Sequence, residues 1–108
     1  MGFNDYIMNF FQGESKQIIL QYRDSGMKAL DMTGYVFSLV GKESELQPDP
    51  LFTKDDSCFD KTDAASGKIT LTFLADMPPM AYMCQITAAK GKVVDKSTIF
   101  QVEVSISL

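Results

Sequence analysis

The chain of 108 residues contains no histidine, two cysteines, and ten basic against fourteen acidic residues. Without histidine it lacks the commonest general base of enzymes and the commonest protein ligand of transition metals. A Ser-His-Asp triad is therefore excluded. These absences argue against an enzyme, and we expect neither a cofactor nor a bound metal ion.

Basic residues are too few for several classes of partner. The net charge is −4 and the isoelectric point is about 4.6. A nucleic-acid-binding domain normally carries a basic stripe, and a protein held at a membrane surface by charge carries a polybasic cluster. No apolar run reaches the length of a membrane span. We therefore expect no nucleic-acid partner and no membrane insertion.

The two cysteines have no spacing typical of a metal site. Cys84 alternates with Tyr82 and Ile86, which is typical of a small buried hydrophobic residue. Cys58 lies in an acidic loop and is either free or paired with Cys84. Pairing requires closely spaced Cα atoms, so the sequence leaves both alternatives open.

Apolar and polar residues alternate in several short stretches, which is the period of a half-buried β-strand. The clearest case is the C-terminal stretch, where Phe100, Val102 and Val104 alternate with polar residues and the pattern continues to Leu108. The stretches with strand character are residues 17–22, 35–40, 68–73, 80–89 and 97–108.

Turn residues separate the predicted strands. Asp24-Ser25-Gly26 is typical of a tight turn, and Asp31 with Thr33 is expected to cap the short hook that follows. Lys90-Gly91-Lys92 indicates a hairpin. Residues 41–59 form a long polar connection, which predicts either a functional loop or a short edge strand within it.

Six or seven short strands joined by turns predict an all-β fold. Residues 13–108 are expected to form one antiparallel β-sandwich, immunoglobulin-like in size and layout. A small barrel is the alternative. The C-terminal strand, residues 100–108, is considered as an open edge to which a partner strand could add.

Residues 1–12 have a different pattern from the rest of the chain. Their large apolar residues fall at helical spacing and predict a short amphipathic helix or an irregular arm, packed on its own domain or docked on another subunit. The docking interpretation predicts that removal of residues 1–11 leaves the fold intact and abolishes assembly. Its partner-binding residues are Phe3, Tyr6, Ile7, Phe10 and Phe11.

Acidic side chains crowd the long connection and its surroundings. A calcium site there would need spaced oxygen ligands around a turn glycine, and that glycine is missing, so a solvated acidic loop is expected. The acidic residues in question are Asp49, Asp55, Asp56, Asp60 and Asp63. As a receptor-binding loop, the same region would present Leu46, Leu51, Phe52, Asp55 and Asp56.

Several motifs together resemble the N-terminal immunoglobulin-like domain of phage baseplate upper proteins. Gln12-Gly13-Glu14 precedes the strand at Ile18, and the Asp24-Ser25-Gly26 turn leads to a Leu30-Asp31-Met32-Thr33-Gly34 hook before the next strand. Met32 stands where the family's hook has leucine. The resemblance continues through Gly67-Lys68-Ile69 and spans residues 12–108.

The resemblance implies a virion structural protein of a bacteriophage or prophage, assembled in the bacterial cytoplasm. Such a protein would act as a small adaptor in the tail, baseplate or head appendage. Its partners would be other virion subunits, in a homo-oligomer or a hetero-assembly, and its work would be docking. The alternative is a receptor- or carbohydrate-binding module that presents residues 42–63.

Overall fold

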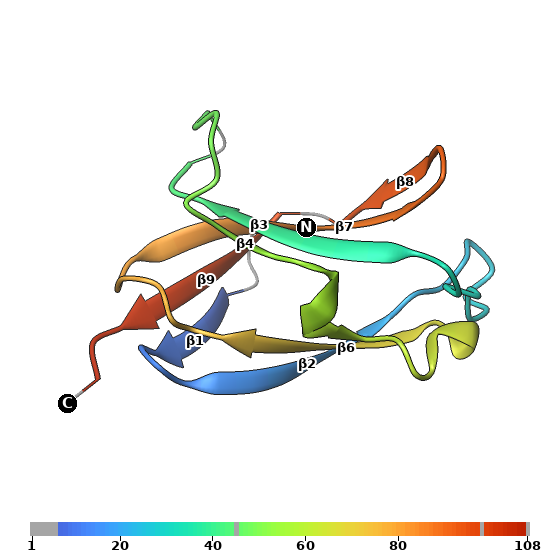
Figure 1. Cartoon of the computed structure of the whole chain (residues 1–108), viewed down its shortest axis with the longest axis horizontal. Coiled ribbons are helices and arrows are strands. Elements are labelled where there is room, and N and C mark those ends of the chain that lie inside the picture. The colour runs from blue at the N-terminus through green and yellow to red at the C-terminus, as the bar shows by residue number, and fades with distance from the viewer. Residues whose placement is uncertain (1–6, 45, 98, 108) are drawn as a thin grey trace.

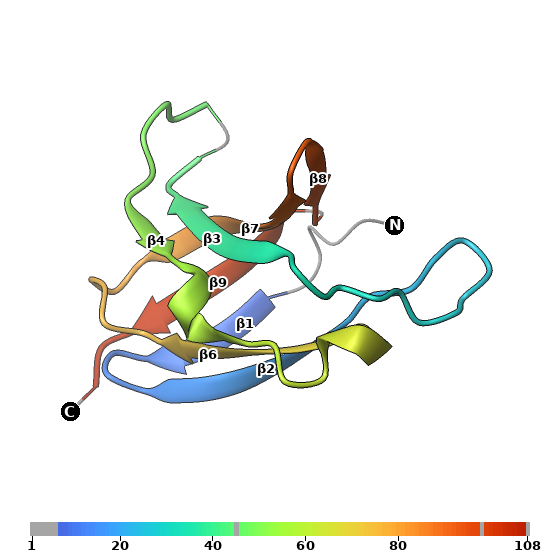
Figure 2. The same cartoon turned by 45° about the vertical axis from the view of Figure 1, so that its right-hand side comes forward.

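A computed structural model describes residues 7–44, 46–97 and 99–107. The regular secondary structure of the described residues is almost wholly β-strand, and the strands form two sheets that pack face to face (Figure 1). The view in Figure 2 separates the two layers and shows a loop projecting from one end. The predicted all-β sandwich is confirmed.

The larger sheet contains six strands. Their bounds are β1 Ile7–Phe11, β3 Val36–Lys42, β4 Phe52–Lys54, β7 Ala81–Lys90, β8 Val93–Lys96 and β9 Phe100–Ser105. The order across the sheet is β1-β9-β7-β3-β4, and β8 pairs with β7 beyond the end of β9. β1 runs parallel to β9, whereas the other neighbours are antiparallel.

The smaller sheet has the order β2-β6-β5, with β2 Ser15–Gln21, β5 Phe59–Asp60 and β6 Lys68–Leu74. Two single-turn 3-10 helices, η2 Asp56–Cys58 and η3 Ala64–Ser66, lie on either side of β5. The two strand orders correspond to the B-E-D and G-F-C sheets of an immunoglobulin-like sandwich. This layout confirms the sequence-based prediction.

The core lies between the sheets and is apolar. Along β6, Ile69, Leu71 and Phe73 are fully buried, and they belong to the same buried cluster as Tyr82 and Cys84 of β7 in the other sheet. No polar or charged residue is buried in the described part of the chain. Burial of each large apolar side chain contributes about 1.5–3 kcal/mol. Because alternation directs one such side chain at every second position into the core, this burial is the main source of stability.

Tyr82 anchors the start of β7 to the preceding turn. Its hydroxyl donates a hydrogen bond to the carbonyl oxygen of Pro78 at 2.5 Å. A tyrosine two residues before a cysteine, bonded to upstream backbone, is the tyrosine corner of immunoglobulin domains. The cysteine here is Cys84, and burial raises the pKa of its thiol to about 12. Cys84 and Cys58 are both free, so the disulfide alternative is wrong.

The N-terminal helix prediction is wrong for residues 7–11, which form strand β1. Parallel pairing with β9 turns Met8 and Phe10 toward the core and leaves Asn9 on the outer face. The ring of Phe10 lies 4.9 Å from that of Phe73, between centroids. Asn9 is exposed and shares the outer face with Ile7 and Phe11. Residues 1–6 lie outside the described residues.

β9 is not an edge strand, because β1 and β7 flank it on its two sides. The expectation that residues 100–108 offer an edge for strand addition is therefore wrong. β9 also ends at Ser105, and Ile106 is 70% exposed. The predicted burial along this stretch holds for Phe100, Val102 and Val104, and Leu108 lies outside the described residues.

The predicted strands at residues 17–22 and 35–40 correspond to β2 and β3, which belong to different sheets. The connection between them crosses from one layer to the other (Figure 2). A carboxylate oxygen of Asp24 accepts hydrogen bonds from the backbone N–H groups of Gly26 and Lys28, at 2.8 and 3.0 Å. The predicted turn is confirmed, and β4 confirms the short edge strand expected within residues 41–59.

Candidate functional site

Three aspartates make the same local contact with the chain. In each, one carboxylate oxygen accepts from both the backbone N–H and the hydroxyl of a serine or threonine two residues later. The pairs are Asp31 with Thr33, Asp55 with Ser57, and Asp60 with Thr62. The cap predicted at Asp31 is confirmed. The same Asp-x-Ser/Thr spacing identifies the other two, which sequence reasoning had left as acidic loop.

These caps affect the chemistry of the carboxylates. The hydroxyl and then the backbone N–H of Thr33 hold the pKa of Asp31 below its ordinary value, and Thr62 does the same for the pKa of Asp60. A carboxylate with a lowered pKa is a poor general acid at neutral pH. The two groups therefore serve local structure, and their geometry offers no proton donor for catalysis.

Asp56 joins two parts of the sandwich. One of its carboxylate oxygens accepts from the backbone N–H of Phe37 at 2.8 Å, and the other pairs with the ammonium group of Lys61 at 2.7 Å. Lys61 also donates to the carbonyl oxygen of Tyr35 at 3.1 Å. The hydrogen bond from Lys61 is the main cause that lowers the pKa of Asp56. Asp56 is thus engaged with its own chain.

The predicted receptor residues do not form one surface. Phe52 packs edge-on against the rings of Tyr82 and Phe73, at 5.1 and 5.9 Å between centroids. Phe52 is therefore half-buried against the core. Asp55 belongs to the cap with Ser57, and Asp56 to the ion pair with Lys61. Leu46 remains 94% exposed, and Leu51 is also exposed.

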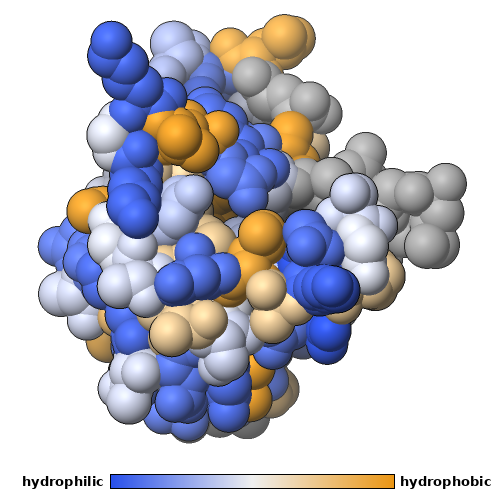
Figure 3. All heavy atoms as spheres, turned by 90° about the vertical axis from the view of Figure 1, so that its right-hand side faces the viewer, coloured by the Kyte–Doolittle hydropathy of each residue, from blue (hydrophilic) through white to orange (hydrophobic). Residues whose placement is uncertain are grey.

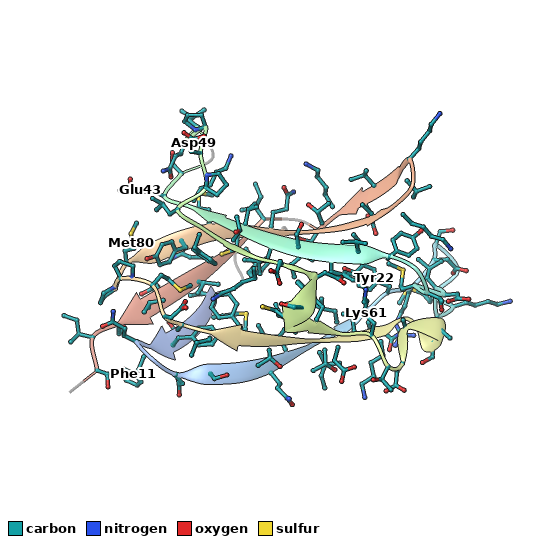
Figure 4. The ribbon with its side chains drawn as sticks, in the orientation of Figure 1. Phe11, Tyr22, Glu43, Asp49, Lys61 and Met80 are labelled. Carbon is teal, nitrogen blue, oxygen red and sulfur yellow. The ribbon has the colours of Figure 1, made fainter. Side chains whose placement is uncertain are left out.

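Leu46 and Leu51 lie in the loop between β3 and β4, which projects from the sandwich. Figure 4 labels Glu43 and Asp49 in this loop, in the upper part of the view, whereas Phe11 is labelled in the lower part. The backbone N–H of Leu51 donates to the carbonyl oxygen of Gly41 at 2.8 Å and closes the base of the loop. The loop therefore projects from a base that the bond between Leu51 and Gly41 holds in place.

The predicted docking residues are also divided. Ile7 and Phe11 lie on the outer face of β1 and are 45% and 59% exposed. Phe10 is 2% exposed and fills the core, so it is unavailable to a partner. Removal of residues 1–11 would delete β1 and the buried ring of Phe10, so the structure gives reason to expect that this truncation destabilises the fold. Phe3 and Tyr6 lie outside the described residues.

The outer face of the larger sheet carries an open hollow of about 270 Å³. Lys42, Met83, Gln85, Lys96 and Ile99 contribute to its lining. No carboxylate lines the hollow within the described chain, so it offers no pair of acids for hydrolysis. Across all residues that the structure describes, no group of three or more Cys, Asp or Glu side chains converges as a metal site.

Figure 3 views the molecule from the end that lies at the right of Figure 1, and shows apolar side chains separated by hydrophilic ones outside the area covered by grey atoms. Within the described residues, no helix is long and apolar enough to cross a membrane.

Comparison with models of known protein families finds no match, and comparison with curated proteins finds none either. The candidate surfaces are therefore identified from the exposure of their side chains alone. They are the outer face of β1, with Ile7 and Phe11, and the projecting loop, with Leu46 and Leu51.

Proposed function

We propose that this protein is a structural component of a phage or prophage virion, a β-sandwich adaptor that docks on other virion subunits. One observation carries the docking role: β1 keeps Phe11 and Ile7 exposed on its outer face while its inward residue Phe10 is locked into the core. The motif resemblance over residues 12–108 supplies the virion context.

The two exposed side chains suit a docking contact. They lie on the same face of β1, because they are an even number of residues apart in a strand. They flank Asn9, and their partners across the sheet are Gln101 and Ser105 of β9. Large apolar side chains that a partner can desolvate carry most of the energy of an interface. Figure 4 shows Phe11 at the margin of the molecule.

The test examines particles from the host that encodes the protein. Particles are purified by density gradient, and their proteins are identified and quantified by mass spectrometry. We expect this chain to sediment with the particles at a fixed ratio to the other subunits. Its absence from intact particles, with abundant free protein in the same lysate, would refute the proposal.

Two matched variants locate the docking face. Phe11→Ser is expected to reduce incorporation into particles, because it removes an anchor and leaves the core unchanged. Val93→Ser removes a similarly exposed apolar side chain from β8 and is expected to incorporate normally. Thermal unfolding of both purified variants checks that the fold is retained.

A receptor-binding function has one observation in its favour, the near-complete exposure of Leu46 on a projecting loop. Residues 43–50 can be replaced by a glycine-serine segment of equal length, which keeps the bond between Leu51 and Gly41. This function predicts that binding to a carbohydrate array or to host cells is lost in the loop variant and retained in Phe11→Ser.

A further inference from the structure

β2 is bonded to β6 along one side only, and the described chain provides no strand along its other side. The backbone N–H of Tyr22 donates to Gly67, and the carbonyl oxygen of Glu14 accepts from Ala75, both in the direction of β6. Backbone groups alternate in direction along an antiparallel strand. The residues whose N–H and C=O groups point away from β6 are therefore Ser15, Gln17, Ile19 and Gln21.

The core is incompletely covered along this edge. Ile18 and Leu20 of β2 turn toward the core but stay half-buried. Their partners across the sheet, Leu71 and Ile69, are fully buried. The difference arises because β2 has a neighbour on one side and β6 has neighbours on both. A strand added beside β2 would complete the cover.

Other edges of the sandwich carry devices that oppose pairing. The ammonium group of Lys16 donates to the carbonyl oxygen of Asn9 at 2.8 Å and so occupies an outward acceptor of β1. β4 and β5 contain three and two residues, which is too short for an extended ladder. Capped, short or charged edges are the usual protection against edge-to-edge association.

β8 is protected by its charges. Ser97 donates its N–H to Ile86 of β7, so Val94 and Lys96 direct their backbone groups outward. If two copies paired antiparallel through these groups, each possible register would place like charges opposite each other. The opposed residues would be Asp95 and Asp95, Lys96 and Lys92, or Lys96 and Lys96. Like charges directly opposite each other destabilise a strand pair.

β2 lacks this conflict. We propose that two copies of the chain associate antiparallel through their β2 edges, about a two-fold axis at Ile18. In this register Gln17 opposes Ile19 of the second copy, and Ser15 opposes Gln21. The single charge of the strand, Lys16, opposes Leu20.

This register overlaps the whole of β2, so every outward backbone group of the strand gains a partner. A two-fold axis brings the same patch of both copies together, as in most homodimers. The two small sheets become one continuous sheet, and Ile18 and Leu20 gain cover. The pairing depends on the chain alone and goes beyond the proposed role in a virion.

The test measures the mass of the full chain by sedimentation equilibrium across a wide concentration range. Gln17→Pro removes one outward N–H and leaves the bonds to β6 in place, since proline is accepted where the N–H of an edge strand faces solvent. Two lost hydrogen bonds per dimer are expected to raise the dissociation constant by about tenfold or more. The control Gln17→Ala keeps the N–H and is expected to dimerise like the native chain.

Cysteine cross-linking tests the register. In a Cys58→Ser background, Ile18→Cys places two thiols opposite each other at the axis, where Cβ atoms are about 4.5–5.5 Å apart, and oxidation should link the copies. Ser15→Cys lies away from the axis and should not cross-link. This result also decides the matter if Gln17→Pro fails to fold.

Three outcomes overturn the inference. The native chain could remain a monomer at every concentration, or Gln17→Pro could dimerise as tightly as Gln17→Ala. In the third outcome, a chain that begins at Ile7 dimerises while the full chain stays monomeric. Residues 1–6 of the same chain, and not a second copy, would then pair with the β2 edge.

Discussion

Replacement of Gly41 with alanine should displace Phe52 from the core. Gly41 lies in β3 directly opposite Phe52 of β4. An added Cβ would lie 2.7 Å from Cδ1 of the Phe52 ring and still closer to Cε1 and Cζ. Ordinary contacts of a Cβ atom do not approach below 3.0 Å. The ring must therefore leave its place between Tyr82 and Phe73.

The cost follows from what the ring loses. Half-burial of a phenylalanine is worth about 1–1.5 kcal/mol, and each of the two edge-on ring contacts adds about 0.5–1.5 kcal/mol. Gly41→Ala should thus lower the free energy of unfolding by about 3 kcal/mol. For a domain of this size the unfolding midpoint should fall by roughly 10–20 °C, and the protein should remain folded at room temperature.

A double-mutant cycle separates this mechanism from general strain in β3. Urea unfolding is measured for the native chain, Gly41→Ala, Phe52→Ala and the double variant. If the ring is the obstacle, Gly41→Ala costs little once Phe52 is alanine. An equal cost of Gly41→Ala in both backgrounds would refute the reasoning, and so would a neutral effect in the native chain.

Two further predictions concern backbone geometry and pH. Gly67→Ala should destabilise the fold by more than Gly13→Ala. Both glycines have positive φ, but only at Gly67 would an added Cβ meet backbone, the carbonyl oxygen of Tyr22 at 2.6 Å. Urea unfolding of the two variants checks this, and equal losses of stability would contradict it. The free energy of unfolding should be constant near neutral pH and decline as the pH falls below about 4. The reason is that carboxyl groups with a lowered pKa bind protons only at a lower pH in the folded chain than in the unfolded chain. The carboxyl groups with lowered pKa are those of Asp31, Asp56 and Asp60. Urea midpoints measured across this pH range check the prediction. Replacing any one of the three with asparagine should make the decline shallower, and an unchanged decline would show that these carboxyl groups are not its source.

The sequence predicted the strands whose two faces separate cleanly. Ile69, Leu71 and Phe73 alternate with Lys68, Thr70 and Thr72, and burial in β6 follows that pattern. β1 was missed because its partner β9 lies at the other end of the chain. The large apolar residues of the segment fall at helical spacing, and only the pairing with a distant strand makes residues 7–11 a strand.

The candidate site was predicted less well, because exposure of an aromatic residue depends on distant contacts. Phe52 lies among polar residues in the sequence, yet a glycine in the neighbouring strand provides the space that admits its ring to the core. Phe10 is held by Phe73, more than sixty residues away. The sequence left open whether Leu46 pins its loop or is presented to a receptor, and in the structure its side chain is almost fully exposed.

The same dependence on distant pairing decides which edges are open. The sequence analysis considered β9 as an open edge, but β1 covers β9, and Lys16 in turn bonds to the carbonyl oxygen of Asn9 in β1. The open edge is therefore that of β2. The two proposed contacts then use different parts of the molecule: side chains on the outer face of β1, and backbone groups at the edge of β2. Gln17→Pro should weaken pairing by about tenfold or more without removing the Phe11 anchor, and Phe11→Ser should impair incorporation while leaving the dimer intact. If either variant alone abolished both properties, the two contacts would have to be one surface, and the separation argued from the strand order would be wrong.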